Sequence, residues 1–199
     1  MIRVATATAG VVLAVLLVGA QPAAARPPFP DTIGTADLLS LERAVPGVMT
    51  DWVAAGRADG EVGDRDVLGM IMNSIGDDAD AARRELLAGV LTERMVEPQL
   101  EHFAAEFWSA LYLVQPSTVY VGNRFEIASW ESAQVLGDIA RVRVSARQHY
   151  VFPNGTEGAE PWHRYLIVLE RDPDARYGWL LVERSASQDS RPVESVADR

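Results

Sequence analysis

The sequence predicts an α+β fold in which N-terminal helices pack on a bent antiparallel sheet of about four strands. Apolar side chains recur at helical spacing from about residue 37 to residue 114, whereas residues 117–185 alternate between apolar and polar side chains as strands do. Because all the expected helices precede all the expected strands, the order favours segregated layers over alternating βαβ units. The length of 199 residues then predicts one domain over residues 37–185.

The first 25 residues are typical of a secretory signal peptide. A single cation at Arg3 precedes the uncharged stretch Val4–Ala25, Pro22 breaks any helix, and three alanines before Arg26 suit signal peptidase. We therefore expect cleavage after Ala25 and a secreted or cell-envelope protein. An uncleaved anchor is the alternative, because 22 uncharged residues nearly cross a bilayer core of about 30 Å.

Two flanking segments are predicted to lie outside the domain. Residues 26–36 contain three prolines near their start, which remove backbone donors and disfavour the α conformation, so they predict an extended tether. Residues 186–199 are polar and predict a disordered tail.

Composition excludes several classes of function. The chain has no cysteine, which excludes disulfide scaffolds, thiol enzymes and cysteine-based zinc modules. Its net charge is −10, and residues 26–115 alone carry 16 acids against 7 arginines, so we expect no nucleic-acid partner. All 18 bases are arginine, which is typical of a GC-rich bacterial genome. No nucleotide-binding or nucleophile motif occurs, and we expect no cofactor and no metal.

The helical half begins with a helix that Asp37 is expected to cap, and Pro46 marks a kink or a break in it. The segment 56–64 is a turn rich in glycine and aspartate, but its spacing does not match a calcium loop. A second helix over 67–75 ends at Gly76. A third starts among aspartates at 77, 78 and 80 and continues to residue 96, after which Pro98 marks a kink or a new first turn.

The last helix carries the most hydrophobic surface of the chain. Its apolar side consists of Leu100, Phe103, Phe107, Trp108 and Leu111. We expect this side to pack across the sheet, and in a hollow cone Phe103, Phe107 and Trp108 would line a ligand cavity instead. His102 and Glu106 are four residues apart elsewhere on the helix and predict a solvated ion pair rather than a metal site.

The strand half shows clearer alternation. A strand around Phe125, Ile127 and Trp130 is expected to contain an irregularity near Ser129, and 136–138 is a turn. In the next strand alanines and valines at 140, 142, 144 and 146 point one way, and arginines at 141, 143 and 147 with His149 point the other way. Residues 153–158 form a hairpin loop, and two further strands cover 162–170 and 179–184.

Three long consecutive antiparallel strands are expected after the helical layer, over residues 138–152, 162–171 and Tyr177–Glu183, the last with a Gly178-Trp179 pair. This arrangement resembles the NTF2-like superfamily, in which helices back a bent, cone-shaped sheet. Helices before strands, behind an export segment, are more similar to VirB8-type periplasmic domains and actinobacterial Mce-associated proteins than to small cytoplasmic isomerases. The resemblance covers about residues 37–185.

One class of function that this resemblance implies is a small-molecule isomerase, dehydratase or hydrolase. Enzymes of the superfamily place a carboxylate or histidine base and a tyrosine donor inside an apolar cone, where burial shifts the pKa toward neutrality. The candidates here are Glu126, His149, His163 and Tyr165, of which the last three can form a cross-strand cluster. His149 shares its strand face with three arginines, which is typical of a solvated face and disfavours a dry pocket.

The favoured class is a non-catalytic binding or assembly domain that recognises an envelope protein, a lipid or a small apolar ligand, and that can form a homodimer through the sheet. Arg141, Arg143 and Arg147 are the candidate contacts to an acidic partner or an anionic lipid. The alternative is that these arginines pair across strands with glutamates at 126, 131 or 170.

Overall fold

The computed structural model describes residues 33–113 and 119–188, and the predicted signal peptide, most of the predicted tether and the end of the predicted tail lie outside these ranges. The helices are α1 (Thr35–Ala54), α2 (Val67–Asn73), α3 (Asp77–Ala88) and α4 (Glu93–Leu113). The strands are β1 (Gly122–Leu136), β2 (Ile139–Val151), β3 (Glu157–Ala159), β4 (His163–Arg171) and β5 (Trp179–Gln188).

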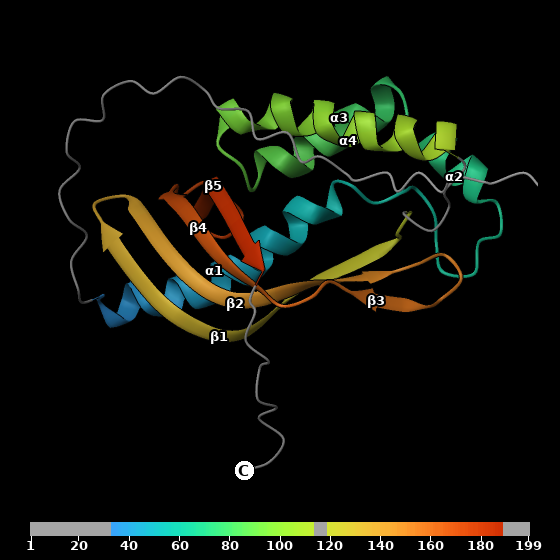
Figure 1. The fold of residues 1–199 in the computed structure, drawn as a ribbon. Coiled ribbons are helices and arrows are strands. Elements are labelled where there is room, and N and C mark those ends of the chain that lie inside the picture. Colours follow the sequence, from blue (N-terminus) through green and yellow to red (C-terminus); the bar gives the residue numbers. More distant parts are fainter. Residues whose placement is uncertain (1–32, 114–118, 189–199) are drawn as a thin grey trace, which may run out of the picture.

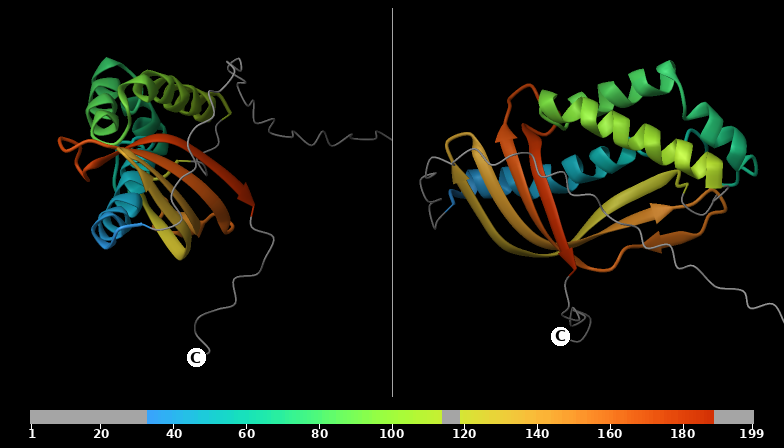
Figure 2. Two further views of the ribbon diagram at one scale, coloured as in Figure 1. Left: turned by 90° about the vertical axis from the view of Figure 1, so that its left-hand side faces the viewer. Right: turned by 45° about the horizontal axis from the view of Figure 1, so that its top comes forward.

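The strands form one antiparallel sheet in the order β1-β2-β4-β5, with the short β3 beside the end of β2. The sheet is strongly bent, and all four helices lie on one side of it (Figures 1 and 2). The predicted α+β class with helices on a bent antiparallel sheet is therefore confirmed. Two details differ: β3 adds a fifth strand inside the expected hairpin loop, and β5 continues through Gln188 into the expected tail.

The bend coincides with irregular pairing in β1. The register between β1 and β2 shifts between Ile127 and Ser129 and again between Trp130 and Ser132. Each extra residue on one strand is a bulge that bends the strand and increases its twist. The irregularity predicted near Ser129 is thus present, and α1 packs along this part of the sheet.

The core lies between the helices and one face of the sheet, which we call the inner face. The even-numbered β2 residues predicted to point into the core, Ala140, Val142, Val144 and Ala146, are 0% exposed. They meet the apolar stripe of α1, and the same cluster includes Tyr165, Ile167 and Leu169 from β4. The alternation of β2 therefore correctly identified its core side.

Helix α1 differs from its prediction at its N-cap, and of the two alternatives at Pro46 the break does not occur. The helix continues past Pro46, and the fully buried Val45 and Val48 on either side hold that turn against the core. Gly34, rather than Asp37, occupies the N-cap position. Asp37 lies in the first turn, where its carboxylate accepts a hydrogen bond from Arg171 at 2.6 Å and so ties α1 to the end of β4.

The helix predicted from residue 77 to residue 96 is not continuous, because α3 ends at Ala88 and α4 begins at Glu93. Leu91 forms a parallel bridge with Leu181 of β5, the Leu181 N–H donates to the Val90 carbonyl, and the Thr92 N–H donates to the Leu181 carbonyl. The apolar residues at 90 and 91 are therefore buried by a strand-like contact along the edge of β5. Pro98 then lies within α4, one turn after its start.

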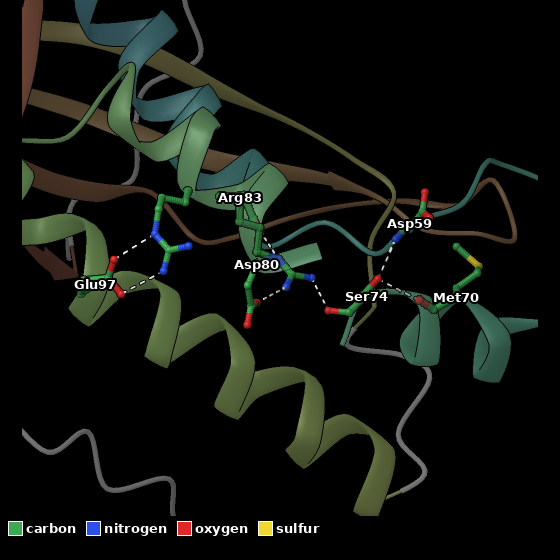
Figure 3. A network of polar contacts seen from close by, with 8 residues as sticks. Asp59, Met70, Ser74, Asp80, Arg83 and Glu97 are labelled. Atoms are coloured by element: carbon green, nitrogen blue, oxygen red, sulfur yellow. Dashed lines mark hydrogen bonds and ion pairs between the residues drawn. The ribbon is translucent and has the colours of Figure 1, made fainter. Parts of the chain in front are cut away.

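Arg83 joins the helices to one another (Figure 3). Its guanidinium donates to the carbonyls of Ala55 and Ser74 and to the Asp80 carboxylate, and it lies 4.6 Å from the Phe107 ring centroid. Because Arg83 is buried, these bonds replace its hydration and fix α3 against the end of α1. Within the described ranges, none of the helices combines the length and the apolar character needed to cross a bilayer.

Candidate functional site

The outer face of the sheet, turned away from the helices, brings together most of the charged residues that the sequence singled out. Arg124 pairs in register with His149, and Glu126 pairs with Arg147, on the adjacent strands β1 and β2. Directly paired residues of antiparallel strands share a face, so all four lie opposite the core. In the left view of Figure 2 the helices lie on one side of the sheet, which leaves this face without a helical layer.

Glu126 is the centre of a polar cluster on this face. Its Oε2 atom accepts a hydrogen bond from Arg147 Nε at 3.0 Å and contacts His149 Nε2. His149 Nδ1 lies 3.4 Å from an Arg124 Nη2 atom, and the Arg147 guanidinium lies 4.4 Å from the Trp162 ring centroid. His149 lies between the Glu126 carboxylate and the Arg124 guanidinium and is only 8% exposed.

Glu126 is a poor general base. The hydrogen bond from Arg147, followed by the one from His149, lowers the pKa of Glu126 below its ordinary value of 4.5. A carboxylate with a lowered pKa binds a proton more weakly, whereas a general base at neutral pH needs a raised one. The observed geometry therefore stabilises the charged form of Glu126 and holds the two strands together.

The predicted cross-strand cluster of His149, His163 and Tyr165 is wrong. His163 pairs with Ala146, and Tyr165 pairs with Val144, so both belong to the inner face, whereas His149 belongs to the outer face. The relative register of β2 and β4 decides this outcome, since a shift by one residue would reverse the faces. Of the four candidate catalytic residues, Glu126 and His149 contact each other on the outer face, and His163 and Tyr165 lie together on the inner face with their ring centroids 6.0 Å apart.

Tyr165 is part of a separate polar group at the inner face. Burial, followed by the nearby Glu160, raises the pKa of Tyr165 to about 12. Glu160 Oε1 accepts a hydrogen bond from the Tyr150 hydroxyl at 2.6 Å, and the Arg184 guanidinium lies 4.0 Å from the Trp52 ring centroid. Sequence reasoning did not identify Glu160 or Arg184. Glu160 directly follows β3, the strand that the turn-rich sequence concealed.

The three candidate arginines have different environments. Arg147 pairs with Glu126 as the alternative interpretation expected. Glu131 instead pairs with Arg164, whose Nε donates to it at 2.7 Å. Arg141 is half-buried, while Arg143 is exposed and forms no ion pair within the part of the chain that the structure describes.

An open depression of about 360 Å³ lies on the outer face, lined by residues that do not belong to the polar cluster. Its lining residues come from β2, β4 and β5 and are Arg143, Arg164, Tyr165, Leu166, Ser185, Ala186 and Ser187. Register places Arg143, Leu166 and Ser185 on one rung and Arg164 and Ser187 on another. Two arginines and two serines therefore meet around one leucine, and no carboxylate belongs to the lining.

The aromatic residues of α4 divide between core and solvent. Phe103 and Phe107 are buried, in two separate apolar clusters, so these side chains fill space between the layers. Trp108 is 46% exposed, which contradicts its predicted place in the packed side of the helix. At about 100° per residue, Trp108 lies about 140° around the helix from Phe103, and it contacts Tyr112 instead.

His102 and Glu106 form the expected exposed pair, with His102 Nε2 3.3 Å from a Glu106 carboxylate oxygen. Within the described residues, no group of three or more His, Asp or Glu side chains is arranged to hold a metal ion.

Comparison with known proteins finds little similarity. No family model matches the chain, and no curated protein matches it. A solved structure to which the chain is similar is a nuclear transport factor 2 (NTF2-like) superfamily protein from Salmonella enterica subsp. enterica serovar Typhimurium str. LT2. The two share 15% identity with a TM-score of 0.34, and the alignment covers 67% of this chain and 92% of that chain.

Proposed function

We propose that this chain is a secreted or envelope-tethered binding domain without catalytic activity, and that it contacts its partner through the outer face of the sheet. The observation that carries the proposal is the position of Glu126 and His149. Both lie on the face opposite the core, and Glu126 binds both His149 and Arg147. The residues best suited to chemistry are therefore engaged in a structural cluster outside the cone.

The division of the candidates between two faces supports the same conclusion. A single active site would need base and donor within hydrogen-bonding reach of one substrate. Glu126 and His149 lie on the outer face, whereas His163 and Tyr165 lie on the inner face. The backbone of the sheet separates the two pairs.

Charge supports an acidic partner. The outer face carries five arginines, Arg124, Arg141, Arg143, Arg147 and Arg164, of which Arg147 and Arg164 pair with Glu126 and Glu131, in a chain with a net charge of −10. An arginine-rich surface on an otherwise acidic protein orients an incoming anionic partner toward that surface. We further propose that the domain is NTF2-like and of the VirB8-type or Mce-associated kind, which fits helices placed before the strands behind an export or anchor segment.

Site-specific crosslinking tests this proposal, because the cysteine-free sequence allows a single reactive thiol to be placed at will. Ser132→Cys and Ser185→Cys on the outer face, and Met72→Cys on exposed α2, would each carry a photoactivatable crosslinker in cells that make the protein. We expect the same partner to be crosslinked from both outer-face positions and not from Met72→Cys.

Addition of Arg143→Gln to the outer-face variants should reduce that crosslink, whereas addition of Arg43→Gln on α1 should leave it unchanged. Arg43 is exposed and its Nε donates to the Leu39 carbonyl of its own helix. Arg43→Gln therefore removes the same charge as Arg143→Gln, but at a position away from the outer face. A partner crosslinked from Met72→Cys on α2, or an outer-face crosslink that Arg143→Gln does not reduce, would overturn the proposal.

A second candidate function, a small-molecule enzyme acting inside the cone, is favoured by the tyrosine–glutamate group of the inner face. Glu160 binds the Tyr150 hydroxyl and lies near Tyr165, which supplies a carboxylate beside two phenols. Tyr165, with a pKa of about 12, would act as a hydrogen-bond donor and not as a base. Binding of an apolar phenol or enone that is lost in both Glu160→Gln and Tyr165→Phe, while Glu126→Gln binds normally, would support this candidate.

A further inference from the structure

We infer that the depression on the outer face is a binding site for a phosphate ester, with Arg143 as its principal ligand. This inference rests on the proposed function and deepens it by naming the chemistry of the partner. The ligand class is a phosphate group that carries a small organic substituent. It can belong to a soluble phosphate ester or to the headgroup of an anionic lipid.

The donors around the depression come from three strands. Arg143 lies on β2, Arg164 on β4, and Ser185 and Ser187 on β5. Neighbouring strands are about 4.8 Å apart, so these groups are spread over the floor of the depression and can bind different oxygens of one ligand. A tetrahedral phosphate offers several acceptor oxygens pointing in different directions, whereas a carboxylate offers two in one plane. A guanidinium can bind two phosphate oxygens at once, and a serine hydroxyl can donate one further hydrogen bond to the same group.

The two arginines have complementary roles. Arg143 is exposed and forms no ion pair among the described residues, so its charge is available to a ligand. Arg164 is held at its Nε by Glu131, at 2.7 Å, which fixes its guanidinium at the rim of the depression. A guanidinium that is already fixed loses less conformational entropy when a ligand binds. Arg164 therefore serves chiefly as a preformed donor at one side of the ligand.

A buried hydroxyl lies on the same face, next to Arg164 but outside the lining of the depression. Ser145 pairs in register with Arg164, and its side-chain oxygen is buried without a hydrogen-bond partner among the described residues. Buried polar groups are normally satisfied, and an unsatisfied one costs about 1–3 kcal/mol. The polar groups in this part of the outer face are thus not fully paired with one another.

The size of the depression argues against a bare ion. About 360 Å³ exceeds the space that a single phosphate fills, and Leu166 forms an apolar part of its wall. A phosphate with a short glycerol-like or sugar-like substituent would fill the space and contact Leu166. Openness to solvent also permits the substituent to continue into a larger molecule, such as a lipid.

Calorimetric titration of the exported chain tests this inference, with glycerol phosphate as the soluble probe, glycerol as the uncharged control and acetate as the carboxylate control. We expect saturable binding of glycerol phosphate only. Arg143→Gln should weaken it about tenfold, and Ser185→Ala about threefold, as expected for the loss of a charged and a neutral hydrogen bond. Arg43→Gln should leave it unchanged.

A second arm identifies the source of the phosphate. Vesicles of phosphatidylglycerol and of phosphatidylcholine would be tested by cosedimentation, with and without glycerol phosphate as competitor. Binding to phosphatidylglycerol that requires Arg143 supports a lipid headgroup, and binding of glycerol phosphate alone supports a soluble ester. The inference would be overturned if neither glycerol phosphate nor phosphatidylglycerol vesicles bound, or if Arg43→Gln weakened binding as much as Arg143→Gln.

The two proposals can fail separately. If glycerol phosphate does not bind but the outer-face crosslinks persist and depend on Arg143, the binding face stands and the phosphate class is wrong. If glycerol phosphate binds through Arg143 but the crosslinks map to α2, the phosphate site stands and the wider outer-face proposal is wrong.

Discussion

Arg83 and Arg143 show two uses of arginine in a chain that contains no lysine. Arg83 is buried where α1, α3 and α4 meet, and its donors bind two backbone carbonyls and Asp80. Arg143 is exposed on the outer face beside an open depression and forms no ion pair among the described residues. The first arginine is fully committed to the fold, and the second has hydrogen-bonding capacity left for a ligand. Burial and partners, rather than residue type, therefore indicate which arginine is functional.

The largest effect that this comparison predicts is the destabilisation caused by Arg83→Met. Methionine keeps much of the aliphatic volume but leaves the carbonyls of Ala55 and Ser74 without their donor. We expect a loss of about 2–4 kcal/mol in the free energy of unfolding, because each unsatisfied buried polar group costs about 1–3 kcal/mol. Urea denaturation followed by circular dichroism measures this change.

The neighbouring residue provides a matched control for that measurement. Arg84 is also on α3, but its guanidinium forms a fully exposed pair with Glu97 at 2.9 and 3.2 Å. Exposed ion pairs contribute little, so Arg84→Met should change stability far less than Arg83→Met. Equal losses in the two variants would show that Arg83 acts through helix propensity alone, contrary to the role assigned to its hydrogen bonds.

A smaller effect is expected at Glu126, which is intermediate between the two arginines in exposure. Glu126→Gln removes the negative charge next to Arg147 and His149 but preserves the shape of the side chain. We expect a loss of less than about 1 kcal/mol at neutral pH, since the pair is partly exposed and screened by solvent. Thermal melts of the two proteins at pH 7 measure it, and a loss comparable to that of Arg83→Met would mean that the outer-face cluster is a structural centre.

The pH dependence sharpens this prediction. The pKa of Glu126 is lower in the folded protein than its ordinary value of 4.5, chiefly because of Arg147. The stabilisation that Glu126 provides is therefore complete above pH 4.5 and is lost as the pH falls through the lowered folded pKa. The stability of the wild type should decline more steeply below pH 4.5 than that of Glu126→Gln, as urea midpoints at pH 3, 4, 5 and 7 would show. Parallel profiles would contradict the assigned ion pair.

The sequence predicted what local patterns determine. Alternation along β2 correctly separated the core residues from Arg143 and His149, because side-chain direction in a strand depends only on position along that strand. The irregularity near Ser129 was also anticipated from the interrupted alternation around it. The pairing of Glu126 with Arg147 was one of several cross-strand options, and register selected it.

The features that could not be predicted from the sequence depend on packing between distant segments. The separation of His149 from His163 follows from the register between β2 and β4, which no local pattern specifies. Residues 90 and 91 have good apolar spacing for a helix, yet they bridge to Leu181 at the edge of β5. The depression forms only where β2, β4 and β5 lie side by side. No local pattern around Ser185 and Ser187 could therefore identify them as lining residues.

The smallest effect on stability is expected at Arg143, where the comparison with Arg83 is most sharply tested. Arg143→Gln should change the free energy of unfolding by no more than about 0.5 kcal/mol, because substitutions of exposed residues outside internal networks are nearly neutral. The same variant should bind glycerol phosphate about tenfold more weakly, so stability and binding would separate at this residue. Urea denaturation and calorimetric titration on one preparation measure both quantities. A variant that is clearly destabilised would place Arg143 with Arg83 among the structural arginines and remove the basis for a ligand at the depression.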